Sequence, residues 1–208
     1  MSSPFDPVRL LEPPTATAAR ALEVAREWCS PALVNHCLRS WLWATTLGES
    51  LGLSVDDELL FVAAMLHDLG VTDPFDAHAM PFESSGGAAA WTFAAGAGWS
   101  APRRERVMQV IERHMWVSVD VDEDPEGFLL EAATSLDVAH ADPEKWDAAL
   151  RRDVSALVPR LDFGPGFAAA IEAQACRKPS SAAARLHASG RIARGDAAWA
   201  ATADPHSS

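Results

Sequence analysis

Apolar residues recur every three or four positions along most of this chain, which is the spacing of one buried face of an α-helix. Leu33, Cys37, Trp41 and Ala44 form one such stripe. The pattern predicts helices over residues 15–28, 31–51, 56–70, 82–98, 100–114, 124–137, 142–158, 167–178 and 180–194. No segment alternates apolar and polar residues as a strand does, so the sequence predicts an all-α bundle of about eight to nine helices.

Residues that favour helix ends support these boundaries. Thr15 or Thr17 can cap the first helix, and Ser30-Pro31 places a capping hydroxyl before a proline at the first helical position. Asp124-Pro125 has the same character at a later start. These signals indicate short connections between successive helices.

The pattern also predicts the domain organisation. Pro-rich residues 1–14 are expected to form a flexible N-terminal arm, and residues 195–208 a flexible C-terminal tail. One domain over residues 15–194 lies between them, long enough to bury a sizeable core.

Charge narrows the class of partner. The 208 residues include 17 Lys and Arg against 29 Asp and Glu, a formal net charge of −12. This balance argues against binding to nucleic acid or to an anionic membrane, because both need clustered cations. A small-molecule substrate is compatible with it, and a homo-oligomer is neither required nor excluded.

The number and spacing of the cysteines indicate in which cellular compartment the protein is expected. Cys29, Cys37 and Cys176 form no Cys-x-x-Cys pair, so they suggest neither a thiolate zinc site nor a disulfide framework. No secretory signal and no membrane-spanning apolar run is visible. Reduced thiols in a cytoplasmic protein are therefore expected.

The most apolar predicted helix ends in an unusual way. Residues 59–66 are uninterruptedly apolar, and His67-Asp68 and then Gly70 follow. Gly70 is expected to stop the helix in the left-handed conformation, so the pair would occupy the last turn. Buried polar side chains need partners. A histidine at the helix dipole beside a solvated aspartate is one explanation, and a bound metal ion is the other.

Two further motifs favour the metal. Asn35-His36 lies in an apolar helix before the pair, and Ser135-Leu136-Asp137 in one after it. One His, then His-Asp, then Asp, on three helices, resembles the HD superfamily of metal-dependent hydrolases and implies a single HD-domain helical bundle. Residues 34–39, Phe82-Glu83 and residues 163–179 resemble the HD group that includes the cyanamide hydratases.

The resemblance implies that His36, His67, Asp68 and Asp137 bind one divalent cation. Two imidazoles and two carboxylates suit Zn, Fe, Mn or Ni. His67 and Asp68 point about 100° apart around a helix axis, so they can share an ion only off the helix end. Such an ion lowers the pKa of bound water. The resemblance makes Asp68 the candidate that orients or deprotonates this water.

His114 is a further catalytic candidate, on an apolar helix face. It can donate a proton or hydrogen bond to substrate, add a metal ligand, or be a hydrogen-bonded core histidine. Two-metal relatives carry a pair of histidines between the His-Asp motif and the last Asp. Here His114 is single, and His140 follows Asp137 too closely to replace the second. One metal ion is therefore predicted.

Two residues are candidates for substrate binding. Arg39 shares a helix face with His36 and could bind a polar or anionic substrate, or form a structural ion pair. Glu83 could line the site and orient a ligand histidine, or be a helix-start carboxylate. His78 is expected at the surface, and the acidic run 120–126 as a solvated loop.

Three functions compete. The resemblance to cyanamide hydratases implies a hydrolase or hydratase of a compact small molecule. A nucleotide phosphomonoesterase would need cations for the phosphate, and Arg39 is the one inward candidate. A module that binds metal without turnover is the third. Val71 stands where HD phosphodiesterases often have Lys, which disfavours phosphodiester cleavage.

Overall fold

The interior of the protein is built around α4, a helix that is apolar on every side. The computed structural model describes residues 11–203, and every regular element in that range is helical. The α-helices are α2 (Ala16–Trp28), α3 (Pro31–Leu51), α4 (Asp57–Leu66), α5 (Phe82–Gly96), α6 (Ala101–Arg113), α7 (Pro125–Ala139), α8 (Ala148–Leu157), α9 (Phe163–Arg177), α10 (Ala182–Ser189) and α11 (Arg191–Ala203). Two short 3-10 helices are η1 (Leu69–Val71) and η2 (Pro143–Lys145). The all-α prediction is confirmed, and the ten α-helices of residues 11–203 slightly exceed the predicted number.

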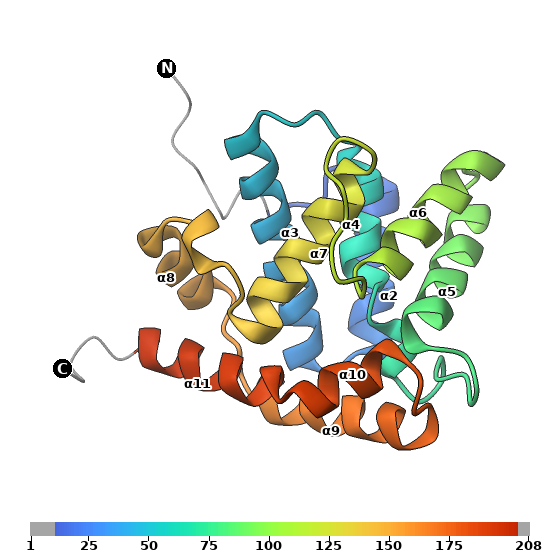
Figure 1. Cartoon of the computed structure of the whole chain (residues 1–208). Helices are drawn as coiled ribbons and strands as arrows, with labels where there is room; N and C mark the ends of the chain where they lie inside the picture. Colours follow the sequence, from blue (N-terminus) through green and yellow to red (C-terminus); the bar gives the residue numbers. More distant parts are fainter. Residues whose placement is uncertain (1–10, 204–208) are drawn as a thin grey trace.

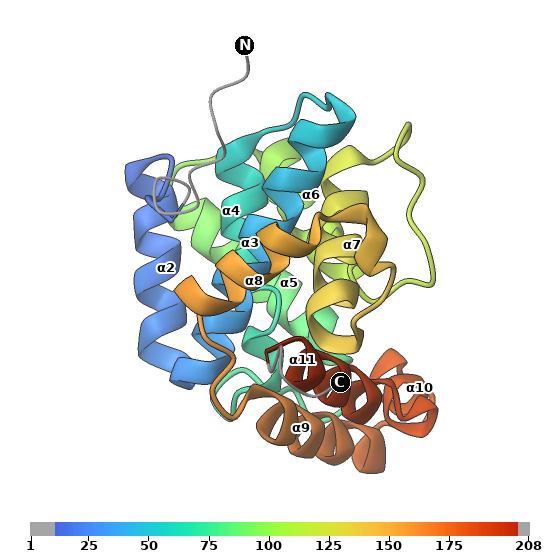
Figure 2. The same ribbon diagram turned by 90° about the vertical axis from the view of Figure 1, so that its left-hand side faces the viewer.

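The helices form an upright group and a layer that crosses its end. α3, α4 and α7 contact one another in the middle, and α5 pairs with α6 on the far side of α4 (Figure 1). Both views show α9, α10 and α11 lying across one end of the upright helices (Figures 1 and 2). No helix within residues 11–203 is both long and apolar enough to cross a membrane.

α4 shows why its sequence has no polar face. Every residue from Leu59 to Leu66 is buried, because α2, α3, α5, α6 and α7 all contact this helix. A helix enclosed by neighbours has no reason to alternate polar and apolar positions. Its C-terminal end therefore delivers the next residues, His67 and Asp68, into the interior rather than to solvent.

Several helix starts follow the predicted capping chemistry. Thr15 Oγ1 accepts a hydrogen bond from the Ala18 N–H, and Ser30 Oγ accepts one from the Leu33 N–H. Asp124 caps α7 by accepting from the Gly127 N–H at 2.7 Å. Each of these side chains satisfies an N–H that has no partner within its helix.

The prediction that Gly70 stops the helix in the left-handed conformation is wrong. α4 ends at Leu66, His67 is its C-cap, and Gly70 lies within η1. A Cβ at Gly70 would come 2.0 Å from the Phe82 carbonyl oxygen, and one at Gly86 would come 2.7 Å from the His67 carbonyl oxygen. The two glycines let α5 pack directly on the turn that carries His67 and Asp68.

Replacing Gly70 with Ala should therefore destabilise the protein by about 2 kcal/mol or more, because the added methyl group forces backbone to move. Urea unfolding of the Gly70→Ala variant measures this effect. Gly96→Ala, in α5 with no atom within 4 Å of the added Cβ, is the matched control and should be neutral or slightly stabilising. Equal stability of the two variants would contradict this role for Gly70.

The expectation of a flexible tail from residue 195 is also wrong over residues 195–203, which belong to α11. Trp199 is 3% exposed, stacks on Trp43 with 6.0 Å between ring centroids, and donates to the Asp137 carbonyl oxygen at 3.1 Å. α11 therefore helps to hold the end of α7. Residues 204–208, and residues 1–10 of the predicted N-terminal arm, lie outside the described range, so the domain limits stay a prediction.

The acidic run 120–126 is not wholly a solvated loop. Asp124 is 1% exposed and forms ion pairs with Arg106 and Arg113 of α6. Burial acts to raise the pKa of Asp124, but the hydrogen bonds from these two arginines and from the α7 N-terminus outweigh it and lower the pKa. The residue joins α6 to α7.

Asp124→Asn should lower the free energy of unfolding by about 1–3 kcal/mol at neutral pH, through the lost charge on its cap and arginine contacts. A depressed pKa in the folded state stabilises fully above the unfolded value of about 3.9, and the effect disappears as pH falls through the folded value. The difference between wild type and variant should therefore vanish in strong acid. Urea unfolding across pH tests this, with exposed Asp122→Asn as control. A difference independent of pH would be inconsistent with it.

Candidate metal centre

Three histidines and one aspartate meet in the interior from three different helices. His36 comes from the second turn of α3, His67 and Asp68 from the end of α4, and His114 is the C-cap of α6. Their exposed fractions are 0%, 0%, 1% and 6% respectively. Four ionisable side chains at this depth need mutual or external compensation.

Each imidazole is fixed by a hydrogen bond on the side away from the centre. His36 Nδ1 donates to Asp137 Oδ2 at 2.7 Å, and His67 Nδ1 donates to the Ala64 carbonyl at 2.8 Å. His114 Nδ1 donates to the Ile111 carbonyl. Because carbonyl and carboxylate oxygens only accept, all three protons lie on Nδ1 when the rings are neutral. Each Nε2 then presents a lone pair.

The lone pairs of His36 and His67 converge with the Asp68 carboxylate, and His114 lies at the edge of this group. His36 Nε2 lies 3.1 Å from His67 Nε2, and Asp68 Oδ2 lies 3.4 Å from the first and 3.2 Å from the second. His114 Nε2 lies 3.9 Å from Asp68 Oδ1. Two lone pairs at 3.1 Å repel each other unless a proton or a metal cation lies between them.

The hydrogen bonding of the Asp68 carboxylate indicates whether a cation fits at this centre. Its two carboxylate oxygens are buried and have no hydrogen-bond partner in the described part of the chain. A buried anion without donors is costly, and a divalent cation would satisfy both oxygens and the histidine lone pairs at once. Potential ligand atoms of His36, His67 and Asp68 all lie within 4.8 Å of one another. The residues therefore fit a cation with nitrogen and oxygen ligands.

The protonation states suit this role. Burial lowers the pKa of His114 to about 3 and also lowers the pKa of His36, so both rings are neutral near pH 7. Burial acts in the same direction on His67, but the adjacent Asp68 carboxylate outweighs it and raises the pKa of His67. Burial would raise the pKa of Asp68, but His67 and His36 hold it at about 2. The Asp68 carboxylate is therefore ionised and attracts positive charge to His67, either a proton in the metal-free centre or a bound cation.

Asp137 lies beside the centre but outside the group of ligand atoms that converge in this structure. It lies behind the His36 ring, on the Nδ1 side, and contacts neither His67 nor Asp68 in the described structure. Its oxygens accept from Arg39 at 2.7 and 2.8 Å and from Trp43 Nε1 at 3.1 Å. With these donors in place, Asp137 orients His36 in this structure, and its role as a metal ligand stays a prediction.

Arg39 is likewise occupied. Besides its two bonds to Asp137, Nη1 donates to the carbonyls of Val158 and Pro159 at 3.3 and 3.2 Å, and the residue is 1% exposed. The structural ion pair, rather than substrate binding, is the role that this geometry supports. The ion pair fixes the His36–Asp137 contact and joins α3 to the segment before α9.

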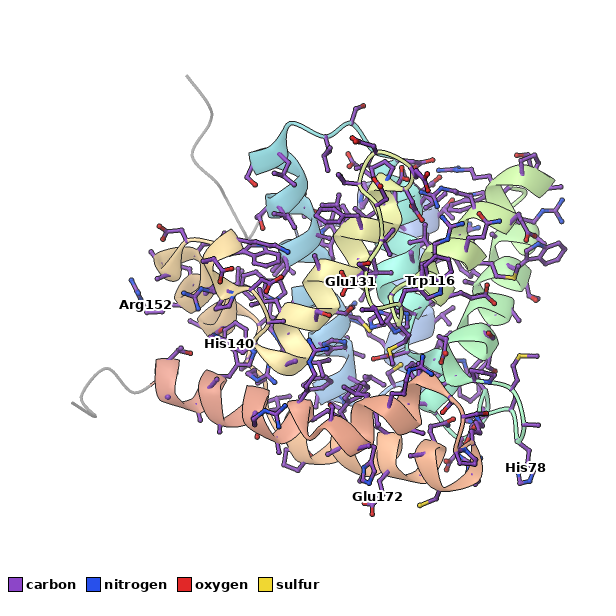
Figure 3. All side chains as sticks on the ribbon, viewed as in Figure 1. His78, Trp116, Glu131, His140, Arg152 and Glu172 are labelled. Atoms are coloured by element: carbon purple, nitrogen blue, oxygen red, sulfur yellow. The ribbon has the colours of Figure 1, made fainter. Side chains whose placement is uncertain are left out.

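The remaining candidates lie apart from the centre. Glu83, at the start of α5, is 9% exposed, and its Oε2 has no hydrogen-bond partner among the described residues. Burial raises the pKa of Glu83. It lines no wall of the cavity above the centre. His78 is exposed on the loop between η1 and α5, as expected (Figure 3).

Sequence reasoning missed the supports of this centre. Phe163 stacks on the His36 ring with centroids 4.4 Å apart, and Arg160 lies 3.4 Å from Asp137. The position of Trp43 could have been predicted from the sequence. His36, Arg39 and Trp43 follow the i, i+3, i+7 spacing, so they share one helix face. The position of Arg160 could not, since it lies in a loop remote in sequence from Asp137.

A cavity of about 460 Å³ opens onto the centre. His36, His67, Asp68 and His114 line its inner end, and residues of the α6–α7 loop, α7 and α10 form its walls. Trp116 and Glu131 belong to two of these walls and lie on the same side of the molecule (Figure 3). The arrangement can admit a small molecule to a buried, polar end, as enzyme sites do.

Comparison with known proteins agrees with this geometry. The HD domain family matches residues 33–116, a range that includes His36, His67, Asp68 and His114. Residues 33–116 are therefore similar to an HD domain, and the comparisons support a metal-dependent hydrolase or hydratase. It is similar to two proteins of Saccharomyces cerevisiae, "Cyanamide hydratase DDI2" and "Cyanamide hydratase DDI3". Each is 27% identical over 179 residues, covering 83% of this chain and 79% of the yeast protein. The resemblance drawn from the sequence is confirmed.

Proposed function

We propose that this protein adds water to a small molecule with an electrophilic carbon of the nitrile kind, at one divalent cation bound by His36, His67, Asp68 and His114. The observation that supports it most is the convergence of the His36 and His67 Nε2 lone pairs on a buried carboxylate without donors, at the inner end of a cavity, with His114 Nε2 3.9 Å from the same carboxylate. The similarity to yeast cyanamide hydratases favours the nitrile group.

The side chains have distinct roles in this proposal. A divalent cation in such a set supplies a Lewis acid and lowers the pKa of the attacking water. The three imidazoles hold their lone pairs in place through their Nδ1 hydrogen bonds, and Asp137 does this for His36. Asp68 has two free oxygens, so one can bind the cation while the other accepts a hydrogen bond from the water and orients it.

The net reaction balances without another reactant. The water oxygen becomes bonded to the nitrile carbon and ends as the carbonyl oxygen of an amide. Both water protons end on the nitrile nitrogen. No oxidant, reductant or leaving group is needed, so the site has to bind one substrate, one water and one cation.

A nucleotide phosphomonoesterase is the second candidate, and it loses support from Arg39. A phosphate group needs cationic donors at the reactive end, and the guanidinium of Arg39 is already bonded to Asp137 and two carbonyls. A module that binds metal without turnover stays the third candidate.

The test uses protein purified without chelator and loaded separately with Zn, Fe, Mn or Ni. We expect turnover of cyanamide or a small nitrile, one bound metal per chain, and loss of both in Asp68→Asn. Phosphate release from nucleotide monophosphates without nitrile hydration would replace this proposal with the second candidate. Full metal content without turnover of any of these compounds would favour the third.

His114→Gln separates metal binding from a structural role. Removal of a ligand should weaken metal affinity by more than the roughly 10–100-fold that loss of an outer hydrogen-bond partner costs. Competition against a chromophoric chelator measures the affinity. His78→Gln, at an exposed histidine, is the matched control and should bind like wild type. An affinity unchanged in His114→Gln would remove His114 from the proposed ligands.

A further inference from the structure

The cavity is much larger than the compact substrate that the yeast relatives suggest. One water takes about 30 Å³ of liquid, so a molecule of three heavy atoms such as cyanamide fills on the order of 100 Å³. The cavity measures about 460 Å³, within the range of sites that bind whole organic molecules. Most of this volume lies beyond the reactive end.

One face of α7 forms a long wall of that volume. Phe128, Glu131, Ala132, Ser135 and Val138 follow the helical i, i+3, i+4 spacing, and all line the cavity. Asp137 points the other way, toward His36. The wall is apolar except for Glu131, Thr134 and Ser135, and Met115, Trp116 and Leu186 add further apolar surface from neighbouring segments.

Glu131 is the polar feature of this wall that lacks a counter-ion. Its Oε1 accepts a hydrogen bond from Ser135 Oγ at 2.9 Å, and it makes no ion pair with any residue from 11 to 203. Burial raises the pKa of Glu131, with smaller opposing effects of Ser135, Lys145 and Arg191, neither cation being close enough for an ion pair. Nearby Lys145 is paired with Asp142 at 2.9 Å. A partly buried carboxylate without a cation provides an acceptor for a positively charged ligand group.

We propose that the substrate is an amphipathic organic cation, with its reactive group at the metal centre, an apolar body along α7 and a protonated amine on Glu131. This inference rests on the proposed function for its reactive end alone. The amine site itself follows from the cavity, the apolar wall and the unpaired Glu131 carboxylate.

The helix gives the length of such a molecule. Glu131 precedes Asp137 by six positions, which corresponds to ~9 Å along the axis of α7 at a rise of about 1.5 Å per residue. Asp137 marks the level of His36. After allowing about 3 Å for the hydrogen bond, roughly five or six bonds of extended chain span the remainder. Aminocapronitrile has this length.

Two arginines of the cavity favour an anionic ligand rather than a cationic one. Arg185 and Arg191 line the cavity and are exposed. They could favour an anionic substrate, which is why the test includes a carboxylate of equal length. Because both arginines are solvated, their attraction for an anion is weaker than that of a partly buried charge for its partner.

Titration calorimetry on the metal-loaded protein tests the amine site with hexylamine, ethylamine, hexanol and hexanoate. We expect hexylamine to bind most tightly and Glu131→Gln to weaken it by roughly 10–100-fold, as for a lost hydrogen bond to a charged group. Glu172→Gln, on the outer face of α9, is the control with the same change in charge and should bind like wild type (Figure 3). Hexylamine binding no tighter than hexanol, or unaltered in Glu131→Gln, would overturn the proposal. So would tighter binding of hexanoate that is lost in Arg185→Gln.

Turnover distinguishes this inference from the proposed function. We expect aminocapronitrile to exceed capronitrile and cyanovalerate in kcat/KM, with the advantage lost in Glu131→Gln. Hydration of all three nitriles at equal efficiency would leave the proposed function standing and reject the amine site. Absence of hydration together with hexylamine binding that depends on Glu131 would reject the proposed function and support the amine site.

Discussion

Asp68→Asn is expected to lose its metal and to fall in turnover by about 10³-fold or more, because the cation supplies several kcal/mol of transition-state stabilisation. The substitution keeps the shape of the side chain and removes its charge. Elemental analysis and nitrile turnover measure the two losses. Asp73→Asn, on the exposed loop after η1, is the matched control.

The same variant makes a second prediction in the metal-free protein. Asp68 is then a buried anion without hydrogen-bond donors in the described structure, and its attraction to His67 and His36 lowers its pKa to about 2. Neutralising it should therefore lower the free energy of unfolding by no more than about 1–3 kcal/mol. Urea unfolding in the presence of chelator tests this. A larger loss of stability in metal-free Asp68→Asn would show that the carboxylate is a structural anchor rather than a ligand held ready for a cation.

Asp137→Ala should destabilise the protein by about 3–5 kcal/mol, because it leaves the Arg39 guanidinium buried without its carboxylate. The Nδ1 proton of His36 and the Trp43 N–H lose an acceptor at the same time. Urea unfolding measures the loss, with exposed Asp153→Ala as control. The double variant Arg39→Met with Asp137→Leu should recover part of the stability, since no unpaired charge is then buried.

Metal affinity shows which role Asp137 has. In the present structure it orients His36 without contacting the cation, so Asp137→Asn should retain the metal with affinity reduced by roughly 10–100-fold. A direct ligand would behave like Asp68. Complete loss of metal from Asp137→Asn would therefore return Asp137 to the ligand role that the sequence resemblance implied.

The sequence was informative where a local rule operates. Helix periodicity, the caps Thr15, Ser30 and Asp124, and the apolar run before His67 all depend on residues close together in the chain. The order of His36, His67 and Asp68 then indicated the HD family, whose model matches residues 33–116. The local helix rules and the order of the motif residues can both be recognised without knowing how the helices pack.

The errors concern packing across helices. Gly70 was expected to stop a helix, and it allows close approach instead. Gly195, where the flexible tail was expected to begin, does the same: a Cβ there would come 2.4 Å from the Val138 carbonyl oxygen. The role of Asp137 as a metal ligand stays a prediction, because the sequence does not tell which side of the His36 ring it faces. His114 was left with three roles for the same reason. Side-chain direction between distant helices is set by the assembled core.

X-ray absorption spectroscopy of the zinc-loaded protein tests the central claim most directly. The spectrum should show three imidazoles at about 2.0–2.1 Å and oxygen ligands, without sulfur. One imidazole should disappear in His114→Gln, and none in Asp137→Asn. Two imidazoles in the wild type, or a spectrum that His114→Gln leaves unchanged, would contradict the proposal that His36, His67, His114 and Asp68 share one cation.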